Sequence, residues 1–292
     1  MSTEGVQAAV KHLSRVSYNV NDEHLLSEMD VFLQCRNNYI VRYISCALQP
    51  TYLAIIMEYA PGGSLHAVME RYPSLDIKTI RCFMHNIISG LFFLHEKNVV
   101  HCDIKPHNML LGVEGVCKLS DFGSCLNVDR VVQDNDQFDV RGTAVYMAPE
   151  VAKGETCTAA SDIFSLGVSL LELVTGRLPW VWTKNAPEDR DVTDMSALYR
   201  NSVRFIQYLC KDYVAVEIPD DMHASAAALA RSCCEMDPCS APGEPAALQP
   251  LPDQLSTYKQ QRESQSVFIA ASFAHRWPSL YTTIIVFPFF SS

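Results

Sequence analysis

A short polar segment at residues 101–108 (HCDIKPHN) holds an acid, an ammonium group and an amide within six positions, and Asp121 follows eighteen residues after the first acid. An aspartate such as Asp103 can accept or orient a hydroxyl proton, and Lys105 can offset the charge of an anion. The side-chain oxygens of Asn108 and Asp121 are hard ligands that suit Mg²⁺. This set suits group transfer from a charged donor. A solvated loop with ordinary turn-forming residues is the alternative interpretation.

Three short motifs occur in a fixed order around these residues. Residues 101–108 read His-x-Asp-x-Lys-x-x-Asn, residues 121–123 read Asp-Phe-Gly, and residues 148–150 read Ala-Pro-Glu after Gly142 and Thr143. Their order and spacing resemble the signature of eukaryotic protein kinases. One such motif would be weak evidence, whereas all three in order at these spacings make a chance match very improbable.

The resemblance implies a role for each polar residue. Phosphoryl transfer needs a group that aligns the attacking hydroxyl and cations that balance the charge of the γ-phosphate of ATP. In a kinase-like site Asp103 would orient the hydroxyl, Lys105 would lie near the γ-phosphate, and these two residues with Asn108 form the predicted catalytic set. Asn108 and Asp121 would hold Mg²⁺.

The amino-terminal part resembles the ATP-binding half of a kinase. Residues 8–13 (AAVKHL) resemble the strand that carries the ATP-phosphate lysine, which would be Lys11. Residues 27–43 resemble the helix and strand that follow, with Glu28 as the ion-pair partner seventeen residues after Lys11. The motif around Lys11 is short, so a surface lysine is the alternative.

The segment MEYAPGGSL (residues 57–65) resembles the kinase hinge. The resemblance implies that Met57 is the gatekeeper and that Glu58 to Ala60 offer backbone groups to adenine. Leu110 is assigned to the same ATP site.

Two further sets of residues are implied to support the site. Phe32, Tyr43, His101 and Phe122 would form an apolar stack, which makes His101 a packing residue and not a base. Asp162, in the segment SDIFSLGV, matches a buried aspartate that supports the catalytic loop. A helix-capping role alone is the alternative for this aspartate.

The substrate class also follows from the resemblance. Lys105 and Thr143 together are typical of serine/threonine kinases, and the pattern GTAVYMAPEV is most similar to the mitogen-activated protein kinase kinase kinase group. The implied function is ATP-dependent phosphorylation of Ser/Thr hydroxyls on proteins, among them downstream kinases, in a MAP kinase type cascade. The alternative is a catalytically weak pseudokinase that acts as a scaffold.

The hydrophobic pattern predicts the elements that position these residues. Alternation of apolar and polar residues, or a short continuous apolar run, predicts a strand. Apolar residues at helical spacing, or a long apolar run, predict a helix, and a polar stretch predicts an exposed loop. The predicted strands are 6–13, 52–60, 108–112 and 116–120, the helices are 22–35, 77–97 and 161–176, and the loop is 183–201. The helix at 77–97 is apolar on much of its surface and is expected to be buried.

The implied fold is α+β: a two-lobed protein kinase-like fold with an incomplete β-rich small lobe and a larger, mainly helical lobe. The expected domains are a partial small lobe at residues 1–60, a large lobe at 61–242 and a poorly ordered tail at 243–292. The apolar stretch in this tail is read as a misread exon or frame, with packing on the large lobe and contact with a membrane as alternatives.

Composition and charge disfavour several other classes of protein. The 292 residues carry a net charge of −10, which disfavours global binding to nucleic acid because acidic chains repel the phosphate backbone. The eleven cysteines include no Cys-x-x-Cys pair and read as reduced thiols. The sequence shows no secretory signal and no apolar run of bilayer length. We therefore expect a cytoplasmic location and no membrane partner.

Three departures from the kinase pattern bear on activity. The glycine-rich phosphate loop is expected upstream of Lys11, where the only glycine is Gly5, so ATP binding or turnover should be weakened. An incomplete gene model of an ordinary kinase is the alternative explanation for the missing loop. Cys102 replaces the usual arginine, and no Ser, Thr or Tyr lies between Cys125 and Gly142. We therefore expect activation without loop phosphorylation, with sequence drift in a non-functional copy as the alternative.

The third departure concerns Glu150, whose usual arginine partner is replaced by Ala241 in the segment DPCSAP. An unpaired buried carboxylate is costly, so the activation segment is expected to be less firmly anchored.

Overall fold

The computed structural model describes residues 7–14, 35–127, 142–186 and 195–234. Within these ranges the chain mixes helices with several small sheets, which confirms the predicted combination of α and β structure. The strands are β1 (Ala8–Ser14), β2 (Tyr43–Leu48), β3 (Tyr52–Glu58), β4 (Gly63–Ser64), β5 (Val99–Val100), β6 (Met109–Leu111), β7 (Cys117–Leu119), β8 (Leu126–Asn127), β9 (Trp180–Trp182) and β10 (Val214–Val216). The helices are α2 (Leu65–Arg71), α3 (Ile77–Glu96), α5 (Pro149–Ala152), α6 (Ala159–Thr175), α7 (Met195–Tyr199), α8 (Ser202–Cys210) and α9 (Ala224–Cys234).

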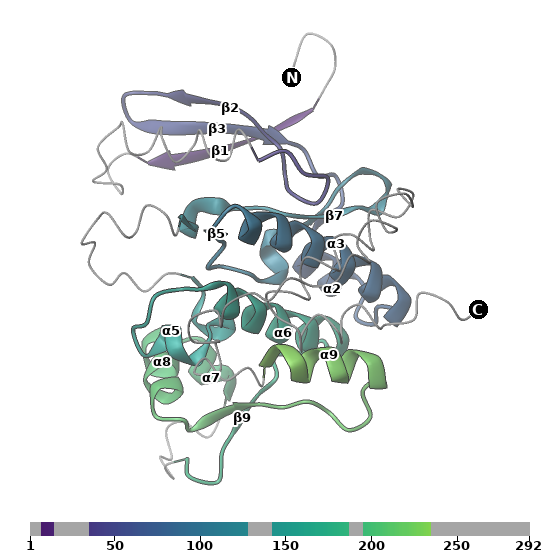
Figure 1. Cartoon of the computed structure of the whole chain (residues 1–292), viewed down its shortest axis with the longest axis vertical. Coiled ribbons are helices and arrows are strands. Elements are labelled where there is room, and N and C mark those ends of the chain that lie inside the picture. Colours follow the sequence, from purple (N-terminus) through teal and green to yellow (C-terminus); the bar gives the residue numbers. More distant parts are fainter. Residues whose placement is uncertain (1–6, 15–34, 128–141, 187–194, 235–292) are drawn as a thin grey trace, which may run out of the picture.

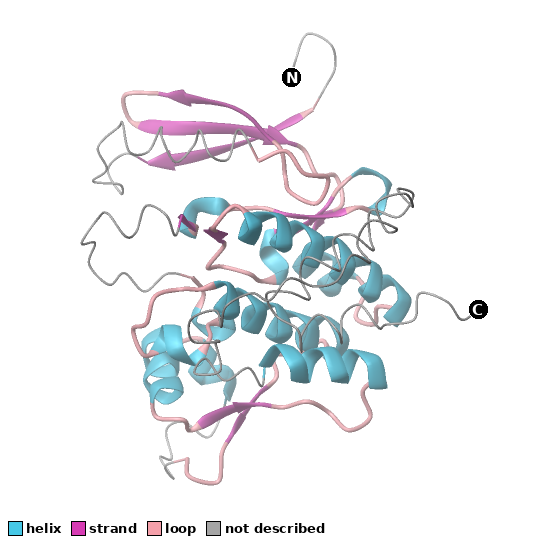
Figure 2. Ribbon diagram, in the orientation of Figure 1, coloured by secondary structure: helices cyan, strands magenta, loops and turns pink. Residues whose placement is uncertain are grey.

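Strands β1, β3 and β2 form an antiparallel sheet with β3 in the centre. The sheet lies at one end of the molecule and the helices make up most of the rest (Figures 1 and 2). On β3 the side chains of Leu53, Ala54, Ile55 and Met57 are buried, and Ile56 is less so. The antiparallel pairing with this strand fixes the register of β1 and places Lys11 opposite Ile55.

Helices α3 and α6 form the centre of the helical part (Figure 1). Helix α6 starts with a capping box, in which Thr158 and Ser161 bond each other's backbone, and ends at Gly176, whose φ of 71° is left-handed. Nearly every residue from Ser161 to Leu173 is buried. Helix α3 is buried along one face only, because Lys78, Arg81 and Cys82 are exposed, so the expectation of a largely buried helix was only partly right.

The predicted strands and helices at 6–13, 52–60, 108–112, 116–120, 77–97 and 161–176 correspond to β1, β3, β6, β7, α3 and α6. The helix predicted at 22–35 falls almost wholly outside the described residues. The loop predicted at 183–201 is wrong in part, because α7 lies within it and its Leu198 is only 1% exposed. The hydrophobic contact of this one leucine outweighs the polar character of the surrounding stretch. No helix in the described part of the chain has the length and apolar character needed to cross a bilayer.

Candidate active site

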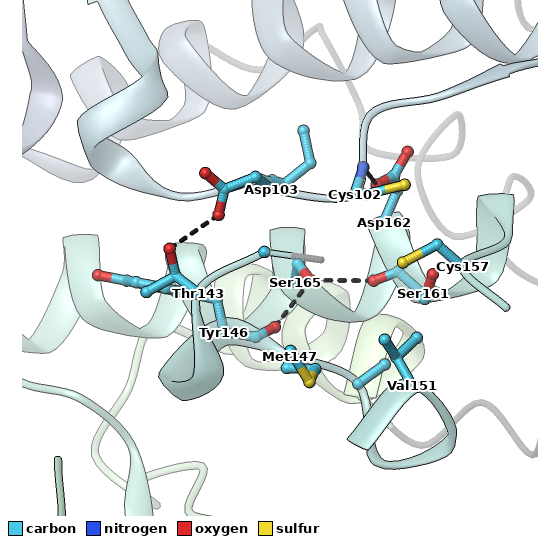
Figure 3. Close-up of a pocket in the computed structure, with 13 residues that line it drawn as sticks. Cys102, Asp103, Thr143, Tyr146, Met147, Val151, Cys157, Ser161, Asp162 and Ser165 are labelled. Carbon is cyan, nitrogen blue, oxygen red and sulfur yellow. Dashed lines mark hydrogen bonds between the residues drawn. The ribbon is translucent and has the colours of Figure 1, made fainter. Parts of the chain in front are cut away.

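Asp103 is the centre of a compact hydrogen-bonded group. Its Oδ2 accepts from Lys105 Nζ at 2.7 Å and from Asn108 Nδ2 at 3.0 Å. Its Oδ1 accepts from Thr143 Oγ1 at 2.8 Å (Figure 3). Lys105 Nζ also donates to Thr143 Oγ1 at 2.6 Å. The structure therefore brings together the three predicted catalytic residues and adds a hydroxyl from 40 residues further along the chain.

The charge of Asp103 follows from these contacts. Burial raises the pKa of its carboxyl, but the hydrogen bond and charge of Lys105 and the bonds from Thr143 and Asn108 outweigh burial, so the pKa lies below its ordinary value. Asp103 is consequently ionised at neutral pH and can accept a proton.

Asp162 of α6 holds the backbone of the loop that carries Asp103. Its two carboxylate oxygens accept from the backbone N–H groups of His101 and Cys102, both at 2.8 Å. Asp162 is 1% exposed, and His95 Nε2 lies 2.8 Å from Oδ2. Cys102 takes a left-handed φ of 64°, and these bonds offset the cost of that conformation. Support of the catalytic loop by Asp162 agrees with the sequence prediction.

His101 is fully buried and uses both ring nitrogens. Its Nδ1 accepts from the backbone N–H of Asp103 at 3.3 Å, and its Nε2 faces the carbonyl of Ser120 at 3.0 Å. Since a carbonyl only accepts, Nε2 carries the proton, and burial lowers the pKa of this imidazole. The ring packs against Phe122, which packs against Tyr43, at centroid distances of 5.3 and 5.6 Å. Three members of the predicted stack are thus in contact and His101 has a packing role. The fourth, Phe32, lies outside the described residues.

Asp121 connects the sheet to the helical part. Lys11 Nζ donates to Asp121 Oδ1 at 2.6 Å, across 110 residues of sequence. Asp121 has a left-handed φ of 61° and its Oδ1 also accepts from Gly123 N–H at 3.4 Å. Lys11 therefore reaches the site, as predicted, whereas Glu28, its expected partner, lies outside the described residues.

The two predicted metal ligands fit a hard cation. Asn108 Nδ2 donates to the carbonyl and the carboxylate of Asp103, so its amide oxygen is the atom left for an external ligand. Asp121 adds a carboxylate next to Ser120, whose N–H and hydroxyl both donate to the carbonyl of Asn108 at 2.9 Å. One amide oxygen and one carboxylate suit Mg²⁺, which keeps most of its waters. The described residues hold no cluster of three or more His, Cys, Asp and Glu residues suited to a metal ion.

The predicted adenine-binding residues lie where the sheet meets the helical part. Met57 is 9% exposed near the end of β3, and Leu110 on β6 packs against the main core. The carbonyl of Ala60 accepts from Gly63 N–H at 3.2 Å. The Glu58 carboxylate has a role that the sequence did not show, because its Oε1 accepts from Lys118 Nζ at 2.7 Å and ties β3 to β7.

The segment from Gly142 to Glu150 borders the site on the side of α6. Gly142 has a φ of 97°, and a Cβ there would collide with the carbonyl of Cys102, so only glycine fits. Tyr146 donates its hydroxyl to Glu172 Oε2 at 2.7 Å, a buried pair that was not predicted. A second carboxylate within a buried, mostly apolar helix was the signal that could have revealed it.

Burial raises the pKa of the Glu150 carboxyl. Ala241, which stands in place of its usual arginine partner, lies outside the described residues. The loss of that partner and the weaker anchoring of the segment therefore stay predictions.

The comparisons with known proteins agree with this geometry. The model of the protein kinase domain matches residues 1–250. Mitogen-activated protein kinase kinase kinase A of Dictyostelium discoideum is 31% identical over 241 residues, 80% of this chain and 24% of that protein. A probable serine/threonine-protein kinase of the same organism is 35% identical over 172 residues, 58% of this chain and 34% of that protein. MAP kinase kinase kinase mkh1 of Schizosaccharomyces pombe is 34% identical over 143 residues, 48% of this chain and 13% of that protein.

The chain spans about a quarter of the length of the first of these relatives, and 34% and 13% of the length of the other two. The matched kinase model nevertheless covers most of the chain, including every described residue. The matched region contains both the hydrogen-bonded group around Asp103 and the ion pair of Lys11 with Asp121. The chain therefore belongs to the protein kinase domain family, and its relatives at 30–35% identity include proteins named MAP kinase kinase kinases.

Proposed function

We propose that the protein is an ATP-dependent serine/threonine protein kinase with a two-lobed arrangement. The observation that carries this proposal is the ionised Asp103 carboxylate, held by Lys105, Thr143 and Asn108 at hydrogen-bond distance. Phosphoryl transfer depends on positioning and on charge balance more than on covalent participation of the protein. A carboxylate fixed by three donors fits that demand.

In the proposed reaction a substrate hydroxyl lies against Asp103, which orients it and accepts its proton. The hydroxyl oxygen bonds to the γ-phosphorus of ATP while the bond from that phosphorus to the bridging oxygen of ADP breaks. Lys105 and Lys11 offset negative charge on the phosphates. Mg²⁺, held by Asn108 and Asp121, would supply further neutralisation of that charge.

The nucleotide is proposed to bind between the β1–β3–β2 sheet and the helical part. Ala60 N–H makes no hydrogen bond with the described residues and is available to adenine, whereas its carbonyl is used by Gly63. Met57 and Leu110 supply apolar contact on either side. The sheet and the helical part would then be the small and large lobes.

The proposed substrates are proteins, with other protein kinases in a MAP kinase type cascade as the favoured class. This finer proposal is supported by relatives whose names include MAP kinase kinase kinase and by the pairing of Lys105 with Thr143 in the site.

The test measures transfer of the labelled γ-phosphate of ATP to a panel of dephosphorylated protein kinases and to a general protein substrate. Asp103→Asn provides the matched comparison, since it removes the negative charge and keeps the shape. We expect phosphoserine or phosphothreonine with the native chain and at least a hundredfold less with the variant. Equal and near-zero rates for both would contradict the proposal and favour a pseudokinase scaffold.

A further inference from the structure

A pocket lies directly beneath the catalytic loop, and two thiols face it. The pocket is bounded by the catalytic loop, the segment from Gly142 to Val151 and the start of α6 (Figure 3). Cys102 contributes from the catalytic loop, and Cys157 contributes from the residue before Thr158, the N-cap of α6. Figure 3 shows both sulfur atoms at the same end of the pocket, next to Asp162.

The two thiols lie close together in the pocket. Cys102 Sγ donates to the carbonyl of Val100 at 3.6 Å, and the Cys157 side chain, 55 residues further along the chain, has the largest influence on the pKa of the Cys102 thiol. Cys102 is partly buried and Cys157 is 9% exposed, so Cys102 is the more accessible of the two. A third thiol, Cys125, donates to the carbonyl of His101 at 3.5 Å. Because Cys102 directly precedes Asp103, these thiols lie next to the candidate active site.

We propose that Cys102 and Cys157 are a reversible oxidation site, in which a peroxide joins them as a disulfide that ties the catalytic loop to the start of α6. The proposal concerns these two thiols only. Its consequence for activity rests on the proposed kinase function, whereas the formation of the bond does not.

The chemistry needs one equivalent of peroxide. The Cys102 thiolate attacks one peroxide oxygen, the O–O bond breaks, and hydroxide leaves and takes a proton to become water. The resulting sulfenic acid is then attacked by Cys157, which forms the S–S bond and releases a second water. Both sulfurs are oxidised by one electron each and the peroxide is reduced by two, so the step balances.

The surroundings of the two thiols set the relative rates of the two steps. The hydrogen bond to Cys157, and then burial, raise the pKa of the Cys102 thiol, so little thiolate exists and the first step is slow. The second step is fast because both groups face the same end of one pocket, which gives a high effective concentration. Oxidation should therefore stop at the disulfide and not proceed to the sulfinic acid.

The crosslink should impair catalysis. Both cysteines are free thiols in the structure, and a disulfide needs an S–S length of about 2.05 Å, so bond formation draws the catalytic loop toward α6. Asp103 is the next residue and its position depends on its bonds to Lys105, Thr143 and Asn108. Since a displacement of about 1 Å costs about a hundredfold in rate, we expect a loss of that order.

The first experiment identifies the bond without reference to activity. The full chain is treated with hydrogen peroxide, its remaining thiols are alkylated, and it is digested without reduction by trypsin and by a protease that cleaves before aspartate. The second cleavage separates Cys102 from Cys117, which trypsin leaves in one peptide. We expect Cys102 joined to Cys157 and loss of this species after dithiothreitol. A Cys102–Cys125 link, or oxidation confined to the exposed Cys82, would overturn the proposal.

The second experiment measures the consequence. Kinase activity after peroxide is expressed relative to the reduced form of each protein, for the native chain, Cys157→Ser and the control Cys82→Ser. We expect about a hundredfold reversible loss in the native chain and in Cys82→Ser, and little loss in Cys157→Ser. Equal loss in all three would overturn the proposed effect on catalysis. If Cys157→Ser does not fold, the peptide mapping of the native chain still decides the bond, and an inactive chain that forms the bond would contradict only the kinase function.

Discussion

The two sides of the site are built differently. On the helical side, the loop around Asp103 is held by Asp162, a carboxylate that is 1% exposed and accepts two backbone N–H groups. On the sheet side, the ion pair of Lys11 with Asp121 has side chains that are 36% and 41% exposed. The loop that carries Asp103 is therefore held by buried hydrogen bonds. The sheet, which is proposed to hold the nucleotide, is attached to the helical part by a contact that water can replace.

The comparison implies that changes on the helical side affect rate and stability together, whereas changes on the sheet side mainly affect nucleotide binding. Fixed donors around a reacting group act without reorganisation, which is the main source of electrostatic catalysis. A nucleotide has to enter and leave, so weaker attachments suit the other side.

The largest expected effect is that of Asp103→Asn on turnover. Removal of the carboxylate abolishes proton acceptance, so kcat should fall by about 10² to 10⁴-fold. The measurement is steady-state phosphorylation at saturating ATP. Asp212→Asn is the matched control, because Asp212 is exposed at a positive φ that asparagine also tolerates. A variant within tenfold of the native rate would contradict the role of Asp103.

The next effect is that of Asp162→Asn on folding stability. The amide group turns one acceptor into a donor that faces a backbone N–H, so we expect a loss on the order of 3 kcal/mol in the free energy of unfolding. Chemical denaturation with a linear extrapolation measures it.

Asp76→Asn is the control for this change, since Asp76 caps α3 from an exposed position and asparagine caps equally well. If Asp162→Asn lowered turnover but left stability unchanged, the idea that one buried residue sets both properties would be wrong.

The sequence predicted which residues form the candidate site better than it predicted the long-range side-chain pairs around them. Asp103, Lys105 and Asn108 lie within six positions, so their spacing alone placed them together. Glu58 and Lys118 are 60 residues apart and His95 and Asp162 are 67 apart. Such pairs depend on how whole elements pack, which no local pattern encodes.

Tyr146 and Glu172 show the same limit at shorter range. Their pairing across 26 residues depends on the segment after Gly142 lying against α6. The apolar run of α6 predicted a buried helix, and the tertiary fold then determined which group would meet its one buried glutamate.

A smaller effect is expected from Tyr146→Phe, and it depends on pH. Burial raises the pKa of Glu172, and the Tyr146 hydroxyl opposes that rise by donating to the ionised form. Loss of the hydroxyl raises this pKa further. Because the folded state then binds its proton more tightly than the unfolded state, stability falls as pH rises from the unfolded pKa toward the folded one.

We therefore expect Tyr146→Phe to cost about 1.5–3 kcal/mol near pH 7 and less near pH 5. Denaturation at both pH values measures the difference. In the background of Glu172→Gln the pH dependence of this cost should disappear, and its persistence there would assign the effect to another group.

The smallest effect is expected from Lys118→Met, which breaks the ion pair between β3 and β7. Both side chains of this pair are about one fifth exposed, at 19% and 23%, so its loss should cost at most about 1 kcal/mol of stability. The Arg42 N–H still donates to Glu58, which keeps this carboxylate hydrogen-bonded. Because Glu58 precedes Ala60, the loss should loosen the segment that is proposed to bind adenine, and it should raise KM for ATP severalfold with kcat nearly unchanged. Lys153→Met, which breaks the exposed pair with Asp212, is the matched control and should change neither constant. A fall in kcat for Lys118→Met would show that the sheet side also positions the reacting groups, and the contrast between the two sides would then fail.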